Sequence, residues 1–335
     1  MSKKKNASPH TTKKRLPKRT AKKALPLQPA EVSRRQLVTL FQEQRRMHNR
    51  VARDRAHRYS EFLAKIPNPT EPLGIEASLR AMAPGPAKQP LRILAEGDSW
   101  FDYPLPLLRG DGVIYQLQKM LGYPVANMAH YGLEVDQMMG LQLRQEIIAR
   151  LSDPNVRFDA LLFSGGGNDL VGDKFCIWLK DSPPVVPPTQ MLDDNAVSAA
   201  MAILAAEYRE LADIRDQTSP ETTIFVHGYD FPLVTGQGVC GAGPWLKPSL
   251  DYAYKKLGVT NPDPNDEYLV VKTFLQRFNT MLNEVAASIR KFVLVPTQGT
   301  LNADSSDWQN EIHPSSKGFV KIAQKFTDSL SSVFP

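Results

Sequence analysis

Residues 92 to 100 read RILAEGDSW, an apolar run that ends in a glycine, an aspartate and a serine. A short apolar run bounded by turn-forming residues is typical of a strand buried inside a parallel sheet. The glycine allows the chain to turn sharply out of the strand, which leaves the next hydroxyl at the edge of the sheet. The stretch therefore predicts a strand over residues 92–96, followed by a serine, Ser99, that is either a nucleophile or a helix cap.

Four further apolar runs follow along the chain, at residues 124–128, 160–164, 222–227 and 291–296. They alternate with segments long enough for helical crossovers, at about residues 111–121, 133–151, 193–217, 267–290 and 315–332. This alternation is typical of a parallel sheet covered by helices on both faces. The sequence predicts a doubly wound α/β domain over residues 91–335, with its ligand beyond the carboxyl ends of the strands.

The N-terminal part differs in composition from this domain. Residues 1–66 carry 19 Lys/Arg against 4 Asp/Glu, whereas the rest carries 22 against 31. Residues 1–30 hold ten Lys/Arg and no acid, so we expect a disordered arm. Such an arm binds a polyanion, either nucleic acid or anionic lipid, or is a solubilising tail with no partner.

Residues 31–66 show the apolar periodicity of a long amphipathic helix, with arginines on the opposite face. We expect this helix to pack on the domain or to pair with another copy in a homo-oligomer. Residues 67–90 contain six prolines and are expected to form a linker or a strap across the domain.

No run approaches the roughly 18 apolar residues of a membrane helix, and no apolar signal-peptide core follows the basic N-terminus. We therefore expect no transmembrane segment and a cytoplasmic location by default, with export by a non-Sec route as the alternative. Cys176 and Cys240 are the only cysteines, which excludes a disulfide scaffold, and we favour free thiols.

Small or polar residues follow most of the predicted strands. Gly132 comes after the second strand, and three glycines and Asn168 come after the third. A glycine at position 132 lets a backbone N–H approach a ligand closely, and the side-chain amide of Asn168 can donate a hydrogen bond to a developing oxyanion. A glycine run also suits a phosphate, but the lysine of a P-loop is missing. After the fifth strand, His313 precedes Pro314 and a predicted helix, so it is either a general base or a structural histidine.

In this order the motifs resemble the four blocks of SGNH/GDSL hydrolases, over about residues 92–330. The matching blocks are Gly97-Asp98-Ser99, Asn127 with Gly132, Gly166-Gly167-Asn168-Asp169 and His313-Pro314. The resemblance implies a flavodoxin-like three-layer sandwich with a five-stranded parallel sheet. It implies hydrolysis of a carboxylic ester (an acyl ester, a lipid or an acetylated carbohydrate) with no metal and no cofactor.

The resemblance also implies a role for each residue of the blocks. Ser99 would be the nucleophile that forms the acyl-enzyme, and His313 would be its general base. The N–H groups of Ser99 and Gly132 and the side chain of Asn168 would form the oxyanion hole.

Asn310 departs from the family pattern, which usually has an aspartate three residues before the histidine. Three explanations compete. Asn310 orients His313 through its carbonyl oxygen, Asp307 or Glu311 takes that role, or the enzyme is a weak Ser–His dyad. We favour the first. If catalysis is feeble, the alternative is a binding module of the same fold that the basic arm tethers to a polyanion.

Four residues are candidates for the substrate pocket because they follow predicted strands: Asp98, Trp100, His227 and Asp230. A structural role, as a satisfied histidine in a capped loop, competes for His227. Asp98 and Asp169 are expected to hold loop N–H groups. Residues 170–192 and 231–266 are long and rich in Pro, Gly and aromatics, so we expect lids or binding surfaces that select the substrate.

Overall fold

A computed structural model describes residues 34–66, 90–103, 111–239 and 241–335 of the protein. The predicted basic arm and nearly all of the predicted linker lie outside these residues. So does Cys240, whereas the thiol of Cys176 is free and donates to the carbonyl of Asp173 at 3.3 Å.

The described residues contain a five-stranded sheet in the order β2-β1-β3-β4-β5, in which all neighbouring strands are parallel. The strands are β1 (Ile93–Gly97), β2 (Ala126–Asn127), β3 (Ala160–Ser164), β4 (Thr223–His227) and β5 (Phe292–Val295). The predicted five-stranded parallel sheet is therefore confirmed, although β2 is shorter than expected. The strand order reverses between β1 and β3, and the crevice at such a switch point is where ligands bind in open α/β sheets.

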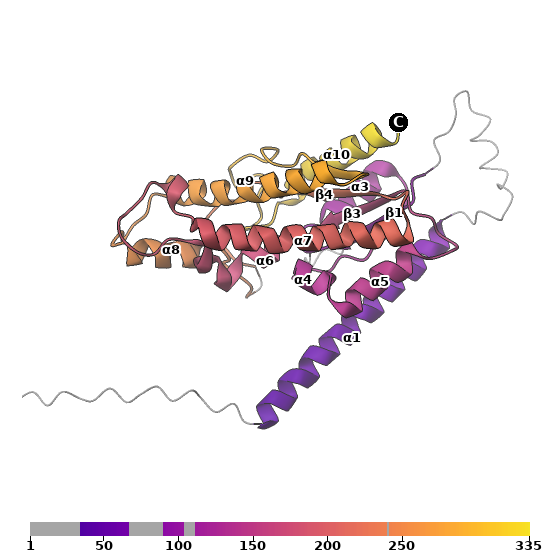
Figure 1. Cartoon of the computed structure of the whole chain (residues 1–335), viewed down its shortest axis with the longest axis horizontal. Coiled ribbons are helices and arrows are strands. Elements are labelled where there is room, and N and C mark those ends of the chain that lie inside the picture. The colour runs from indigo at the N-terminus through magenta and orange to yellow at the C-terminus, as the bar shows by residue number, and fades with distance from the viewer. Residues whose placement is uncertain (1–33, 67–89, 104–110, 240) are drawn as a thin grey trace, which may run out of the picture. The chain divides into compact units, whose positions relative to one another are not determined.

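Helices cover both faces of the sheet (Figure 1). On one face α3 (Val113–Leu121) packs against α10 (Ser316–Val333). On the other face α7 (Asp194–Thr218) lies between α5 (Leu141–Leu151) and α9 (Pro264–Ser288).

Two predicted elements differ in detail. The helix expected over residues 133–151 is divided into α4 (Val135–Met138) and α5, because the extended backbone of Gly140 interrupts it. The segment 231–266, expected as a loop, contains α8 (Lys247–Lys256). The segment 170–192 contains two 3-10 helices, Gly172–Trp178 and Pro188–Gln190, after the short helix α6 (Gly167–Leu170).

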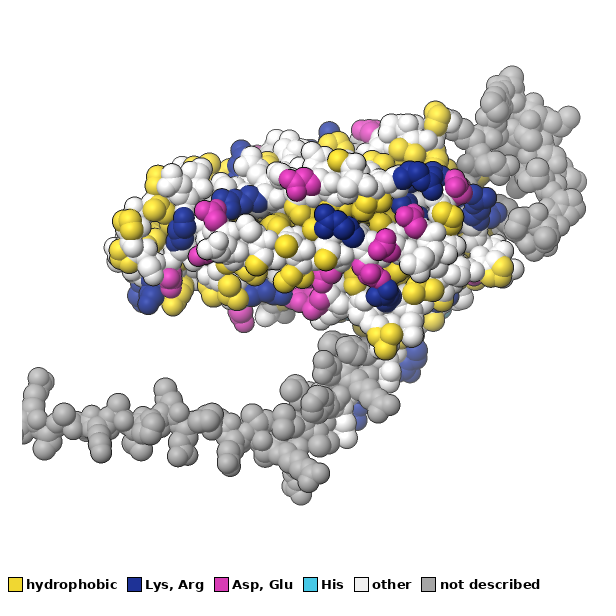
Figure 2. All heavy atoms as spheres, viewed as in Figure 1, with side chains coloured by type: hydrophobic (Ala, Val, Ile, Leu, Met, Phe, Trp, Pro, Cys, Tyr) yellow, Lys and Arg dark blue, Asp and Glu magenta, His cyan; other side chains and the backbone are white. Residues whose placement is uncertain are grey.

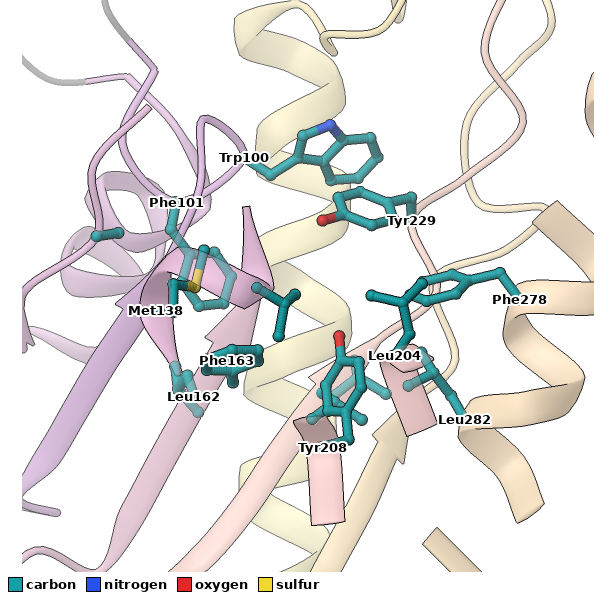
Figure 3. Packing of buried hydrophobic residues seen from close by; sticks show 14 of the residues in the cluster. Trp100, Phe101, Met138, Leu162, Phe163, Leu204, Tyr208, Tyr229, Phe278 and Leu282 are labelled. Atoms are coloured by element: carbon teal, nitrogen blue, oxygen red, sulfur yellow. The ribbon is translucent and has the colours of Figure 1, made fainter. Parts of the chain in front are cut away.

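Aromatic side chains pack at the carboxyl ends of the strands and in the core below them (Figure 3). Trp100 lies against Tyr229 with ring centroids 5.1 Å apart, and Tyr229 stacks on Phe278 at 6.0 Å. Deeper in the core, Tyr208 meets Phe163 edge to face and donates its hydroxyl hydrogen to the carbonyl of Gly165 at 2.8 Å. This packing fixes the loops that follow β1 and β3, since large aromatic contacts leave them little freedom.

The helix α1 (Arg34–Lys65) lies within the segment predicted to be helical. The boundary between two units of the chain falls between His48 and Asn49, which lies inside α1, and the described residues from Asn49 onward belong to the larger unit. In the larger unit, Phe62 of α1 is buried and stacks on Phe158 at 6.0 Å. Arg55, expected with the other arginines on the face opposite the apolar one, is buried and only 1% exposed.

Basic and acidic side chains are interspersed on the face that α7 and α9 form, without a patch of one sign (Figure 2). Two ion pairs join neighbouring helices there: Arg144 of α5 with Glu210 of α7, and Arg277 of α9 with Asp194 of α7. None of the helices in the described ranges combines the length and the apolar character needed to cross a bilayer.

Candidate active site

Ser99 and His313 are in direct contact, although 214 residues separate them in the sequence. Ser99 follows β1, and His313 lies in the loop between β5 and α10. The hydroxyl Oγ of Ser99 is 2.7 Å from His313 Nε2, and both side chains are buried. The structure thus places the two residues at hydrogen-bonding distance beside the switch point of the sheet.

Asn310 sets the tautomer of His313. Its Oδ1 accepts hydrogen bonds from the backbone N–H of Ile312 (3.2 Å) and of His313 (3.0 Å), which identifies this atom as the oxygen of the amide. The same Oδ1 lies 2.9 Å from His313 Nδ1. Because an oxygen can only accept there, Nδ1 carries the ring proton and Nε2 has a lone pair for the Ser99 hydroxyl. This is the tautomer that a general base requires.

The other two candidates for orienting His313 have different partners. Asp307 accepts from the N–H of Asn302 at 2.7 Å and from the ammonium of Lys321. Glu311 is fully buried and turned toward α8, where it accepts the N–H groups of Leu246 (2.8 Å) and Lys247 (2.9 Å), among others. The group that orients His313 in this structure is therefore Asn310.

The loops on both sides of the Ser–His pair are tied together. Asp98 accepts the N–H of Trp100 at 3.0 Å, which shapes the turn that carries Ser99. The indole of Trp100 donates to the carbonyl of Ile312 at 3.1 Å, directly before His313. Gly97 is required at the start of this turn, because a Cβ there would lie 2.7 Å from the carbonyl oxygen of Ser164.

Two aromatic rings enclose the imidazole of His313. The centroid of Tyr103 is 4.8 Å away and that of Trp245 is 5.3 Å away. The hydroxyl of Tyr103 also accepts from Asn310 Nδ2 at 3.0 Å. Burial lowers the pKa of His313 to about 3, so the ring is neutral over the whole neutral pH range.

The three predicted oxyanion donors differ in how many of their N–H hydrogens are already used in hydrogen bonds. The N–H groups of Ser99 and of Gly132, whose φ is +80°, have no acceptor among the residues that the structure describes. Asn168 donates one amide hydrogen to the carbonyl of Leu133 at 2.8 Å, which leaves its second hydrogen for a ligand. Asn168 and Ser99 line the same pocket; Gly132 is not one of its lining residues.

A second serine and histidine lie directly below this site, in a buried network that the sequence did not reveal. Tyr229 N–H donates to His227 Nδ1 (3.2 Å), so the ring proton of His227 is on Nε2, which donates to Ser164 Oγ (2.9 Å). Ser164 in turn donates to Asp98 (2.8 Å), which also receives the hydroxyl hydrogen of Tyr229. Burial raises the pKa of Asp98 to about 6, although these hydrogen bonds oppose the shift.

The proton order in this network runs from histidine to serine to carboxylate, which is the reverse of what activates a nucleophile. His227 is fully buried, and burial lowers its pKa to about 3. The expectation that His227 faces the substrate is therefore wrong. Together with Ser164 it supports the aspartate that shapes the Ser99 turn.

An apolar pocket of about 530 Å³, counted with its open mouth, begins at Ser99. Trp100 and Asp98 contribute to its wall as expected, and so does Asp230. The carboxylate of Asp230 accepts four backbone N–H groups, including those of Gly299 and Thr300, so it holds the loop after β5. The rest of the wall is mainly aliphatic and aromatic, from Leu170, Val171, Pro232, Leu246, Val271, Phe274, Leu275 and Ile312.

Three acids near the site have oxygens within 4.8 Å of one another: Glu134, Asp136 and Asp169. Carboxylate oxygens at such distances suit a divalent cation. Two of these side chains already have partners, since Asp169 accepts the N–H of Val135 at 3.0 Å and Glu134 pairs with Lys174 at 2.7 Å. We assign no metal site to this group.

The chain was compared with known proteins at the level of families, sequences and structures. No family model matches it, and no curated protein is significantly similar in sequence. Solved structures of similar fold include the lipase Lip_vut3 from a goat rumen metagenome (17% identity, 71% of this chain and 97% of that chain, TM-score 0.46). They also include a putative GDSL-like lipase from Parabacteroides merdae (17%, 73% and 97%, 0.44) and a carbohydrate esterase family 3 protein from Talaromyces cellulolyticus (11%, 73% and 98%, 0.42).

Proposed function

We propose that the protein is a serine hydrolase of carboxylic esters. The observation that carries the proposal is the continuous hydrogen-bond chain from Ser99 through His313 to Asn310, with the imidazole in the productive tautomer. The N–H of Ser99, which has no acceptor among the described residues, supports it, because a backbone donor beside the nucleophile can serve in an oxyanion hole.

In the proposed mechanism, Ser99 Oγ attacks the acyl carbon while its proton passes to His313 Nε2. The carbonyl oxygen becomes an oxyanion that receives hydrogen bonds from the Ser99 N–H, the Gly132 N–H and the free Asn168 amide hydrogen. His313 returns the proton to the leaving alcohol, which yields the acyl-enzyme. Water then attacks the acyl carbon with His313 again as base, and the acid is released with Ser99 regenerated.

The pocket favours esters with an apolar acyl group over acetylated carbohydrates. Its wall beyond Ser99 consists mainly of hydrocarbon side chains from α9, such as Val271 and Leu275, and from the two long insertions. Burial of an alkyl chain there contributes about 0.8 kcal/mol for each methylene.

A series of chromogenic esters from acetyl to decanoyl tests the proposal. Wild type should hydrolyse them with a preference above acetyl, and Ser99→Ala and His313→Ala should each lower kcat by at least about 10³-fold. Ser182→Ala and His57→Ala change the same residue types at exposed positions and should behave as wild type. If all five proteins show the same low rate, the hydrolase proposal is wrong and the binding-module alternative gains support.

A further inference from the structure

Arg55 of α1 joins three elements of the domain through one buried guanidinium. It forms a two-pronged ion pair with Glu96 in β1 and a second ion pair with Glu146 of α5. The same group donates to the backbone carbonyl of Met128, just after β2, at 2.6 Å. Glu96 lies three residues before Ser99, so the guanidinium connects the strand of the proposed nucleophile to the segment that follows β2.

Arg58, one turn further along α1, makes a parallel connection. It donates to the carbonyl of Ala129 at 2.9 Å and pairs with Asp102, which lies three residues after Ser99, at 3.7 Å. Arginine suits this role because its planar fork donates several hydrogen bonds in fixed directions. Two successive carbonyls after β2 are thus held by two successive turns of α1.

The opposite side of this segment is held by β1. The N–H of Met128 donates to the carbonyl of Ala95 (2.7 Å), and the N–H of His130 donates to that of Gly97 (2.9 Å). Backbone carbonyls and N–H groups therefore have separate anchors, one set on α1 and the other on β1. The segment ends at Gly132, whose free N–H is a proposed oxyanion donor.

We infer that Arg55 and Arg58 are positioning residues for catalysis. By holding the carbonyls of Met128 and Ala129, they set the position of the Gly132 N–H relative to Ser99. The N-terminal helix is on this account part of the catalytic apparatus. The inference rests on the proposed function. It concerns only the placement of one donor, so it can fail while Ser99 and His313 still hydrolyse esters.

The test compares four variants of the full chain. Arg58→Met removes the donor to Ala129 at a partly exposed position, and Arg58→Lys keeps a cation that can still reach it. Arg55→Lys keeps the buried charge but loses the fork. Arg53→Met is the matched control, because Arg53 is exposed on the same helix and, among the described residues, bonds only to the carbonyl of Asn49 in that helix.

We expect Arg58→Met to lower kcat by about 10–100-fold with KM changed less than about 3-fold, since a small misplacement of a transition-state donor costs about that much. The affinity for an alkyl boronic acid, which forms a tetrahedral adduct on Ser99, should weaken in proportion. Arg58→Lys should recover part of the loss, and Arg55→Lys should lose at least as much as Arg58→Met. Amide hydrogen exchange at residues 128–133 should accelerate in the impaired variants and not in Arg53→Met.

The inference is overturned if Arg58→Met matches Arg53→Met in kcat and boronate affinity, or if its activity falls only with the folded fraction. Should Arg55→Lys fail to fold, the comparison of Arg58→Met with Arg58→Lys decides alone. A wild type that hydrolyses no ester and does not react with a phosphonate refutes the proposed function. The hydrogen-exchange comparison would then still report whether α1 holds the segment.

Discussion

Replacing Asn310 by aspartate supplies the carboxylate that this site lacks. The new Oδ1 can keep all three of its hydrogen bonds, to His313 Nδ1 and to the N–H groups of Ile312 and His313. The second oxygen takes the place of Nδ2, 3.0 Å from the Tyr103 hydroxyl oxygen. The substitution therefore changes charge with little change of shape.

The size of the effect follows from what the asparagine already provides. In serine proteases an Asp→Asn change costs about 10⁴-fold in kcat, because the histidine then adopts the wrong tautomer. Here the tautomer is already correct, so only the stabilisation of the imidazolium is missing. A charged acceptor exceeds a neutral one by about 1–2 kcal/mol, so Asn310→Asp should raise kcat by roughly 5–30-fold.

The assay is kcat/KM for the preferred ester between pH 4 and 9. In wild type the pKa of His313 is lowered to about 3 by burial, so the base stays neutral and the rate should be nearly flat on the acid side. In Asn310→Asp the carboxylate raises the pKa of His313, so activity should fall as the pH decreases through the raised value. Asn302→Asp adds the same charge at an exposed position of the same loop and should change neither property.

A variant Asn310→Asp that folds, yet is slower than wild type at pH 8, would refute the assignment of Asn310 as the group that supports His313. An unchanged acid side of the pH profile would refute it equally, because a carboxylate at 2.9 Å from Nδ1 must shift the titration of the ring.

Three further outcomes are expected. Tyr229→Phe removes a hydrogen-bond donor to buried Asp98 and should lower the free energy of unfolding by about 1–3 kcal/mol. The loss should be larger at pH 8 than at pH 5, because the pKa of Asp98 is raised to about 6 and the carboxylate needs that donor when it is ionised. Equal losses in urea unfolding at both pH values would contradict this. Leu275→Phe narrows the pocket and should reduce rates for the longest acyl chains by about 10-fold while sparing acetyl esters, whereas Leu141→Phe, at an exposed position, should not. Deletion of residues 1–30 should abolish salt-sensitive binding to DNA or anionic vesicles without changing kcat, and persistent binding would exclude the arm as the tether.

The fold was predictable because each strand of a doubly covered parallel sheet is buried on both faces. Such strands read as continuous apolar runs, as ALLFS does at residues 160–164. Ser99 directly follows β1, whose carboxyl end lies at the ligand edge of the sheet, whereas His313 lies 18 residues after β5 and was assigned through the resemblance of the motif order to SGNH/GDSL hydrolases. The helix α8 was missed because prolines and glycines around it predict loop.

The supporting residues of the site could not be predicted from the sequence. Tyr103 contacts Asn310 across 207 positions, and no local pattern reports such a contact. Ser164 ends an apolar strand, and nothing in the local sequence distinguishes it from a residue of the core. Arg55 is one of several arginines in α1, and the sequence does not single it out. It is buried because its guanidinium pairs with Glu96 in β1.

Glu311 gives the candidate site an architectural constraint. Its carboxylate binds the N–H groups of Gly236, Trp245, Leu246 and Lys247, and so joins the start of α8 to the residue next to Asn310. A transplant of residues 231–266 from another protein must reproduce this ring of donors, since a buried carboxylate without them is strongly destabilising. Evolution of a new specificity through this insertion is thereby restricted to sequences that keep one backbone conformation at its root.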